Sequence, residues 1–123
     1  MGDTFSLANK TSRSTIERDV PFQKIKEDVL GKKYELSLVF LLPKEMLAVT
    51  KKYKKKDHVS NVLSFPLSKT SGEILICKEA AAPFTVGYLF IHGLLHLKGC
   101  KHSATMERIE RLYLKKWDIN AHE

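Results

Sequence analysis

Residues 92–102 read His92-Gly93-Leu94-Leu95-His96-Leu97-Lys98-Gly99-Cys100-Lys101-His102 and hold three of the five histidines of the chain. On a helix, residues four apart share a face and are separated by about 6 Å along the axis, so His92 and His96 can point at one place. Gly99 suits the end of such a helix because glycine adopts left-handed backbone conformations, and the turned chain can return His102. Three imidazoles with an open fourth position are typical of catalytic zinc. The stretch therefore predicts a metal site at His92, His96 and His102.

Two alternatives stay open at this stretch. A histidine pair on an apolar helix can serve packing alone, and the leucines between His92 and His96 fit that interpretation. Cys100 lies in the turn before His102, so its thiol is a further candidate ligand, although a small apolar packing role is the simpler expectation. The arrival of His102 after a helix-ending glycine favours the metal site.

The histidine spacing also matches the start of the metzincin protease pattern, H-E-x-x-H-x-x-G-x-x-H. In those enzymes the glutamate is the general base, whereas this chain has Gly93 at that position. Glycine carries no carboxylate, so a zinc peptidase would lack its base. The spacing therefore favours metal-dependent hydrolysis of a different substrate.

A second informative stretch is basic and reads Lys51-Lys52-Tyr53-Lys54-Lys55-Lys56. The chain has a net charge of +7, which favours an anionic partner. A solvated surface run is the plain interpretation of such a cluster. The functional alternative is an RNA-binding ridge, in which Tyr53 stacks on a base and the phosphate contacts come from Lys51, Lys52, Lys55 and Lys56.

The whole chain has 123 residues, of which 43% are hydrophobic and 28% charged. These values predict one domain over residues 1–123 with a core of its own. No apolar run is long enough to span a membrane, and no secretory signal is visible at residues 1–10. We therefore expect no membrane association, a cytoplasmic location, and reduced thiols at Cys77 and Cys100.

Hydrophobic periodicity predicts an α+β fold, in which a small mixed sheet packs with helices and the central helix carries the three histidines. Strands are expected at residues 5–7, 34–42, 61–65 and 72–77. Helices are expected from residues 19–22 to Gly31, at 43–53, at 85–98, and after the N-cap Ser103.

Several details of this expectation can be checked in the structure. Pro66 is expected to end its strand, and residues 66–72 to form a mobile loop. We expect His58 to be exposed and His122 to be disordered near the C-terminus. The apolar side of the last helix is expected to consist of Met106, Ile109, Leu112, Tyr113 and Trp117.

Three sequence blocks resemble one known family. The pattern H-G-x-L-H-L-x-G-x-x-H at residues 92–102 is similar to the signature of the bacterial YbeY family, zinc-dependent single-strand endoribonucleases of ribosomal RNA maturation. Residues 53–66, Tyr-Lys-Lys-Lys-Asp-His-Val-Ser-Asn-Val-Leu-Ser-Phe-Pro, resemble that family's Y-R-x-K-D and T-[DN]-V-L-S-F-P segments. Residues 72–77 are similar to its G-D-I strand. The blocks occur in the family's order, and the resemblance covers roughly residues 34–117.

The resemblance implies a zinc-dependent, single-strand-specific endoribonuclease that acts in ribosomal RNA maturation and small-subunit quality control. It implies one Zn²⁺ per chain and, as partners, single-stranded RNA, ribosomal RNA and the small ribosomal subunit. Lys54 stands at the position of the family's arginine and would join His92, His96 and His102 in catalysis. The family places Asn61 and Ser64 beside the metal, although sheet packing explains them equally well.

The chain departs from the family pattern at several positions. Cys100-Lys101 replaces Tyr-Asp, Lys54 replaces arginine, Glu73 replaces aspartate, and the segment between Cys77 and His92 is short. These departures leave the three ligands in place. They motivate an alternative function, that of a metal-stabilised RNA-binding ribosome-assembly factor with little or no nuclease activity.

Overall fold

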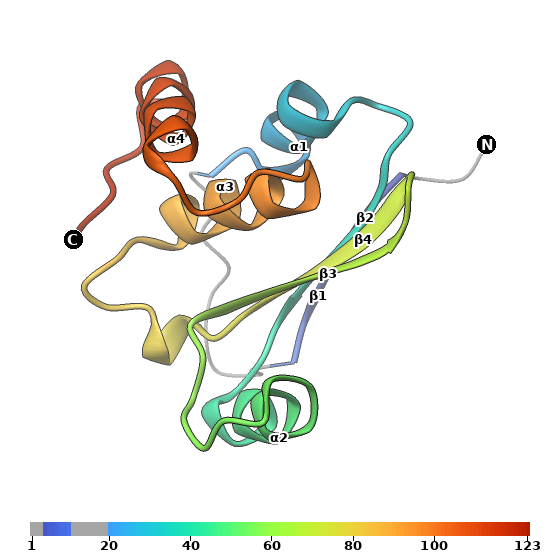
Figure 1. The fold of residues 1–123 in the computed structure, drawn as a ribbon, viewed down its shortest axis with the longest axis vertical. Helices are drawn as coiled ribbons and strands as arrows, with labels where there is room; N and C mark the ends of the chain where they lie inside the picture. Colours follow the sequence, from blue (N-terminus) through green and yellow to red (C-terminus); the bar gives the residue numbers. More distant parts are fainter. Residues whose placement is uncertain (1–3, 11–19) are drawn as a thin grey trace.

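A four-stranded mixed sheet divides the helices into two layers in this computed structural model, which describes residues 4–10 and 20–123 (Figure 1). The strand order is β1 (Phe5–Asn9), β2 (Glu35–Phe40), β4 (Ser71–Ile76) and β3 (Val62–Ser68). β1, β2 and β4 run parallel, and β3 pairs antiparallel with β4. Strand β3 is therefore an edge strand.

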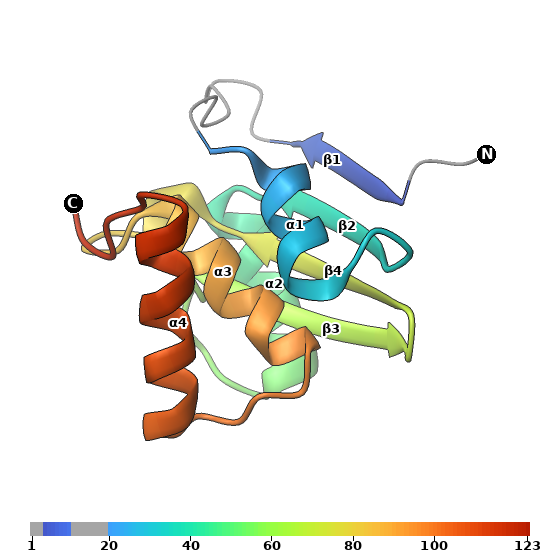
Figure 2. The same cartoon turned by 90° about the horizontal axis from the view of Figure 1, so that it is seen from above.

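The helices cover the two faces of the sheet unequally (Figures 1 and 2). One face carries α1 (Phe22–Leu30), α3 (Val86–Leu97) and α4 (Ala104–Lys116), and the other carries α2 (Pro43–Lys54). α3 packs on β3 and β4 and also contacts α1 and α4, which explains why its sequence is apolar nearly all round. The predicted α+β fold with a central ligand helix is confirmed.

The core has two parts, one on each face of the sheet. The larger part lies under α1, α3 and α4 and includes Ile25, Leu38 and Phe90. The smaller part includes Met46 of α2 and Leu63 of β3. Neighbouring residues of a strand point to opposite faces, so the apolar ends of β2 (Leu38-Val39-Phe40) and β4 (Ile74-Leu75-Ile76) contribute side chains to both parts of the core.

The expectation of a loop at residues 66–72 was wrong. β3 continues through Pro66 to Ser68, and β4 begins at Ser71, so these residues form a hairpin. Proline is tolerated here because an edge strand leaves one row of backbone groups unpaired. The register shifts between Pro66 and Ser68.

The two ends of the chain also differ from expectation in part. The edge strand near the N-terminus is present as β1, whereas the expected helix start at residue 19 lies outside the described residues, and α1 begins at Phe22. His122 forms a β-bridge with Phe84 and packs against its ring, so the expectation of disorder was wrong. Among the described residues, no helix is long and apolar enough to cross a membrane.

Candidate metal centre

Helix α3 begins and ends through local side-chain and backbone contacts. Thr85 is the N-cap, and its hydroxyl accepts a hydrogen bond from the Tyr88 amide at 3.1 Å. At the other end, the Gly99 amide donates to the His96 carbonyl and the Cys100 amide to the Leu95 carbonyl, each at 3.0 Å. These two bonds form a Schellman motif, with Gly99 at φ +100°. The chain therefore leaves the helix at Gly99, as the sequence predicts.

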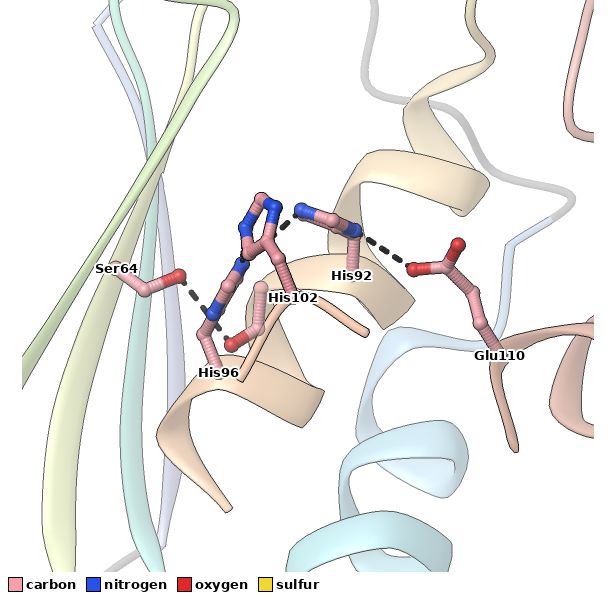
Figure 3. A network of polar contacts seen from close by, with 6 residues as sticks. Ser64, His92, His96, His102 and Glu110 are labelled. Atoms are coloured by element: carbon pink, nitrogen blue, oxygen red, sulfur yellow. Dashed lines mark hydrogen bonds and ion pairs between the residues drawn. The ribbon is translucent and has the colours of Figure 1, made fainter. Parts of the chain in front are cut away.

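The turn brings three imidazole nitrogens together (Figure 3). His96 Nε2 lies 3.1 Å from His92 Nε2 and 2.7 Å from His102 Nε2. One ring nitrogen from each histidine falls within 4.8 Å of the other two. In tetrahedral zinc sites, Zn–N bonds of about 2.0–2.1 Å separate the nitrogens by roughly 3.3 Å. Small side-chain movements would therefore fit the three nitrogens to a metal ion.

A buried carboxylate contacts the ring nitrogen of His92 that faces away from the other two histidines. Glu110 of α4 is 6% exposed, and its Oε2 lies 2.7 Å from His92 Nδ1 (Figure 3). When Nδ1 carries the proton and donates it to Glu110, the lone pair of Nε2 faces the centre, as a metal ligand requires. Glu110 is thus placed to orient His92.

The prediction from sequence placed Met106, Ile109, Tyr113 and Trp117 correctly on the core side of α4, but it missed Glu110 and wrongly included Leu112. Leu112 was assigned to that face but is 63% exposed, whereas Glu110 is buried. The helical period would have found it, since Met106, Glu110 and Tyr113 follow the i, i+4, i+7 spacing. A carboxylate on an apolar helical face is a signal for a partner, because a buried charge needs one.

Burial and neighbouring charges shift the pKa values of two further groups at the centre, His96 and Tyr88. Burial lowers the pKa of His96, and the neighbouring His92 and His102 lower it further. This favours the neutral imidazole that binds metals. Burial raises the pKa of Tyr88 to about 12, with added contributions from the charge of Glu110 and a hydrogen bond to it. The Tyr88 hydroxyl therefore stays protonated at neutral pH.

Gly93 lies where α3 packs closely on β3 and β4. A Cβ at this position would lie 3.0 Å from Ser64 Oγ and 3.1 Å from Ile74 Cδ1. The Ser64 hydroxyl also donates to the Gly93 carbonyl at 3.2 Å. The space that a protease glutamate would need at its Cβ is therefore taken up by the sheet, which agrees with the argument against a peptidase.

The three histidines line a cleft of about 380 Å³ together with Lys54, Asn61, Val62, Leu63 and Ser64. Lys54 is the last residue of α2, and Lys55 follows in the left-handed conformation at φ +56°. The end of α2 thus brings Lys54 to the cleft although the helix lies on the opposite face of the sheet. The hydrogen bond from the Ser64 hydroxyl to Gly93 also fits the packing alternative. At Asn61, the backbone carbonyl accepts a hydrogen bond from the Cys77 amide.

The rest of the basic run is exposed and makes few contacts. Lys51 forms an ion pair with Asp57 at 3.3 Å, and the Lys52 ammonium lies 5.3 Å from the centre of the Tyr53 ring. Lys55 and Lys56 are exposed, as is His58. Among the described residues, the group of ligand atoms that comes together consists of the three histidines, and Cys100 is outside it.

Comparisons with known proteins identify a matching family. The family model described as Endoribonuclease YbeY matches residues 3–118. A Spiroplasma citri protein named Endoribonuclease YbeY is 29% identical over 80% of this chain and 78% of its own length. One of the same name from Rubrobacter xylanophilus is 34% identical over 67% of this chain and 63% of its own length.

The fold likewise has a solved counterpart. The solution structure of TM1509 from Thermotoga maritima superimposes with a TM-score of 0.60, covering 92% of this chain and 88% of that one. The two sequences are 21% identical, so this likeness concerns the fold.

Proposed function

The chain belongs to the Endoribonuclease YbeY family, and from that membership and the three-histidine centre we propose that it is a zinc-dependent, single-strand-specific endoribonuclease. Its role would lie in ribosomal RNA maturation and small-subunit quality control, in the cytoplasm, with the small ribosomal subunit as partner. The observation that carries the proposal is the cleft that Lys54 shares with His92, His96 and His102. A metal site and a cation that can meet a phosphate line the same space.

The donor set fits zinc, because three imidazole nitrogens converge and leave one side open to the cleft. Bound zinc would lower the pKa of a coordinated water to about 7 and polarise a phosphoryl oxygen. His92, His96 and His102 would hold the ion. Glu110 would keep His92 in the tautomer that binds.

Lys54 would stabilise the negative charge that develops on the phosphate in the transition state. Lys54 lines the cleft without belonging to the ligand group. Lysine acts as a point charge and cannot grip a phosphate with two parallel hydrogen bonds, as arginine does. We therefore expect slower catalysis than an arginine would support at this position.

The lysines that flank Lys54 would hold the RNA backbone outside the cleft. Lys51, Lys52, Lys55 and Lys56 are exposed and lie within one turn of it along the chain. Tyr53 would offer its ring to a base. Such contacts are tolerant of sequence, which agrees with a substrate chosen for being single-stranded.

The deciding experiment measures cleavage of an unstructured RNA by the purified protein, together with its metal content. We expect about one zinc per chain and turnover that stops with a chelator and returns with Zn²⁺. An RNA that stays intact under all conditions would contradict the nuclease.

The second candidate is a metal-stabilised RNA-binding assembly factor with little or no nuclease activity. The specific observation in its favour is Lys54, which replaces the arginine of the family pattern in the cleft. The same assay distinguishes the nuclease from the assembly factor. An assembly factor would bind zinc and RNA, but the RNA would stay equally intact with and without chelator.

A further inference from the structure

A second hollow lies on the α2 face of the sheet and has a volume of about 340 Å³. Three large hydrophobic side chains are notably exposed among the described residues, and two of them line this groove: Tyr53 at 57% and Leu67 at 69%. The other lining residues are Val49, Phe65, Glu73 and Leu75. Clustered exposed apolar groups on a soluble domain commonly mark a binding surface.

The groove adjoins the metal cleft across the edge of the sheet. Tyr53 precedes Lys54 on α2, and Phe65 follows Ser64 on β3; in each pair one residue lines the groove and its neighbour lines the cleft. Alternate residues of a strand point to opposite faces, and β3 is an edge strand. A single-stranded chain that passes over this edge can therefore occupy both hollows.

The charge around the groove selects the kind of occupant. The lysines of the run at residues 51–56 surround Tyr53 in the sequence and are all exposed. A phosphate backbone complements this charge, and an apolar groove beside it suits the flat face of a base. An RNA strand thus accounts for both features at once.

The Tyr53 ring is held in place for such a contact. Its ring meets Phe65 edge to face with 5.3 Å between the ring centres, and Lys52 lies over it at 5.3 Å. A ring fixed by its neighbours loses little freedom when a base stacks on it. More than half of its surface stays accessible.

Glu73 adds a polar group that can distinguish bases. It is half-buried in the groove, and within the described part of the chain neither a hydrogen bond nor an ion pair engages its carboxylate. A carboxylate accepts hydrogen bonds from an exocyclic amino group, as with N4 of cytosine. Adenine also carries such a group, whereas uracil presents carbonyl oxygens there.

We propose that this groove is a nucleobase subsite that stacks one base of the RNA on Tyr53 and, through Glu73, favours cytosine or adenine over uracil. The inference rests on the proposed function for its substrate class. It adds a contact on the far side of β3 from the metal and a base preference.

The test measures binding of short oligoribonucleotides made only of C, A or U, by fluorescence anisotropy with chelator present so that none is cleaved. Tyr53→Ala should weaken binding by about 5- to 100-fold, the range that loss of one stacked base implies. Tyr53→Phe should bind almost as well as wild type, since it keeps the ring. Glu73→Gln should reduce the preference for C and A over U.

Matched controls lie elsewhere on the surface. Leu112→Ala removes the third exposed hydrophobic side chain, which is on α4, and should leave RNA binding unchanged. Glu35→Gln makes the same charge change as Glu73→Gln on exposed β2 surface. Thermal unfolding of each variant verifies the fold.

The outcomes separate this inference from the function on which it rests. Wild type that cleaves RNA, with Tyr53→Ala and Leu112→Ala binding it equally well, would overturn the subsite alone, and would be expected if the groove takes a polypeptide. An unchanged preference in Glu73→Gln would overturn the role of Glu73. Wild type that neither binds nor cleaves RNA would overturn the proposed function itself.

Discussion

The three-histidine centre and the lysine run at residues 51–56 differ in how firmly their side chains are held. His92 is fixed by Glu110 at 2.7 Å, and His92 and His96 rise from a helix whose other residues are mostly buried. The lysines are exposed, and the Lys51–Asp57 pair joins two solvated side chains. Loss of one ligand should abolish the metal site, because metal binding needs all three histidines. The exposed lysine surface should instead lose RNA affinity in steps, because each lysine makes its own contact.

The largest effect should follow from removing a ligand. His96→Ala should lose nearly all of the bound zinc, since two imidazoles are a poor site, and RNA cleavage should fall to the level of chelator-treated wild type. Elemental analysis measures the bound zinc, and a cleavage assay measures the RNA cleavage. His58→Ala is the control, because His58 is exposed and outside the ligand group. Equal metal in wild type and His96→Ala would mean that the ion binds elsewhere.

Lys54 belongs to the lysine run by sequence and lines the metal cleft by position. Its substitution therefore tests whether it acts in catalysis or only in RNA binding. Lys54→Ala should keep zinc content and RNA affinity but lose about 10- to 1000-fold in single-turnover cleavage, as expected for a group that acts on transition-state charge. Lys54→Arg should retain or raise the rate. Equal rates for wild type and Lys54→Ala would place Lys54 with the other lysines and favour the assembly factor.

Glu110→Gln should weaken zinc binding without removing any of the three histidines. The neutral amide holds the His92 proton less firmly, so zinc affinity should fall by about 10- to 100-fold, the range typical of groups that orient metal ligands. Competition with a chromophoric chelator measures it. Glu35→Gln, the same change at an exposed position of β2, should leave the affinity unaltered. The same affinity in both variants would show that Glu110 serves packing only.

The smallest and most graded effect should come from the lysines outside the cleft. Replacing Lys51, Lys52, Lys55 and Lys56 with Gln should leave zinc content unchanged and weaken RNA binding. The slope of log affinity against log salt should flatten by up to about 3. With fewer phosphate contacts, RNA binding releases fewer counterions. Titrations at several salt concentrations measure this slope, and an unchanged slope would remove these lysines from the RNA contact.

Prediction from sequence succeeded where the information is local. The alternation of Leu36, Leu38 and Phe40 within the expected strand at residues 34–42 predicted β2, and Ser103 caps α4 as expected. It failed at Pro66, where a rule about proline in strands depends on whether the strand is at the sheet edge. It failed again at Leu112, since the apolar face of α4 is set by its partner α3 and contains a carboxylate.

The candidate site divides in the same way. The sequence alone predicted that His92, His96 and His102 meet, because the four-residue helical spacing and the helix-ending glycine both lie within eleven consecutive residues. Only the tertiary structure decided that Glu110, 18 residues from His92, orients its ring, and that Lys54 reaches the cleft from the opposite face of the sheet. Such meetings depend on how α4 packs on α3 and where α2 ends beside β3. Those distances are set by the buried side chains of the whole core, which no short stretch of sequence contains.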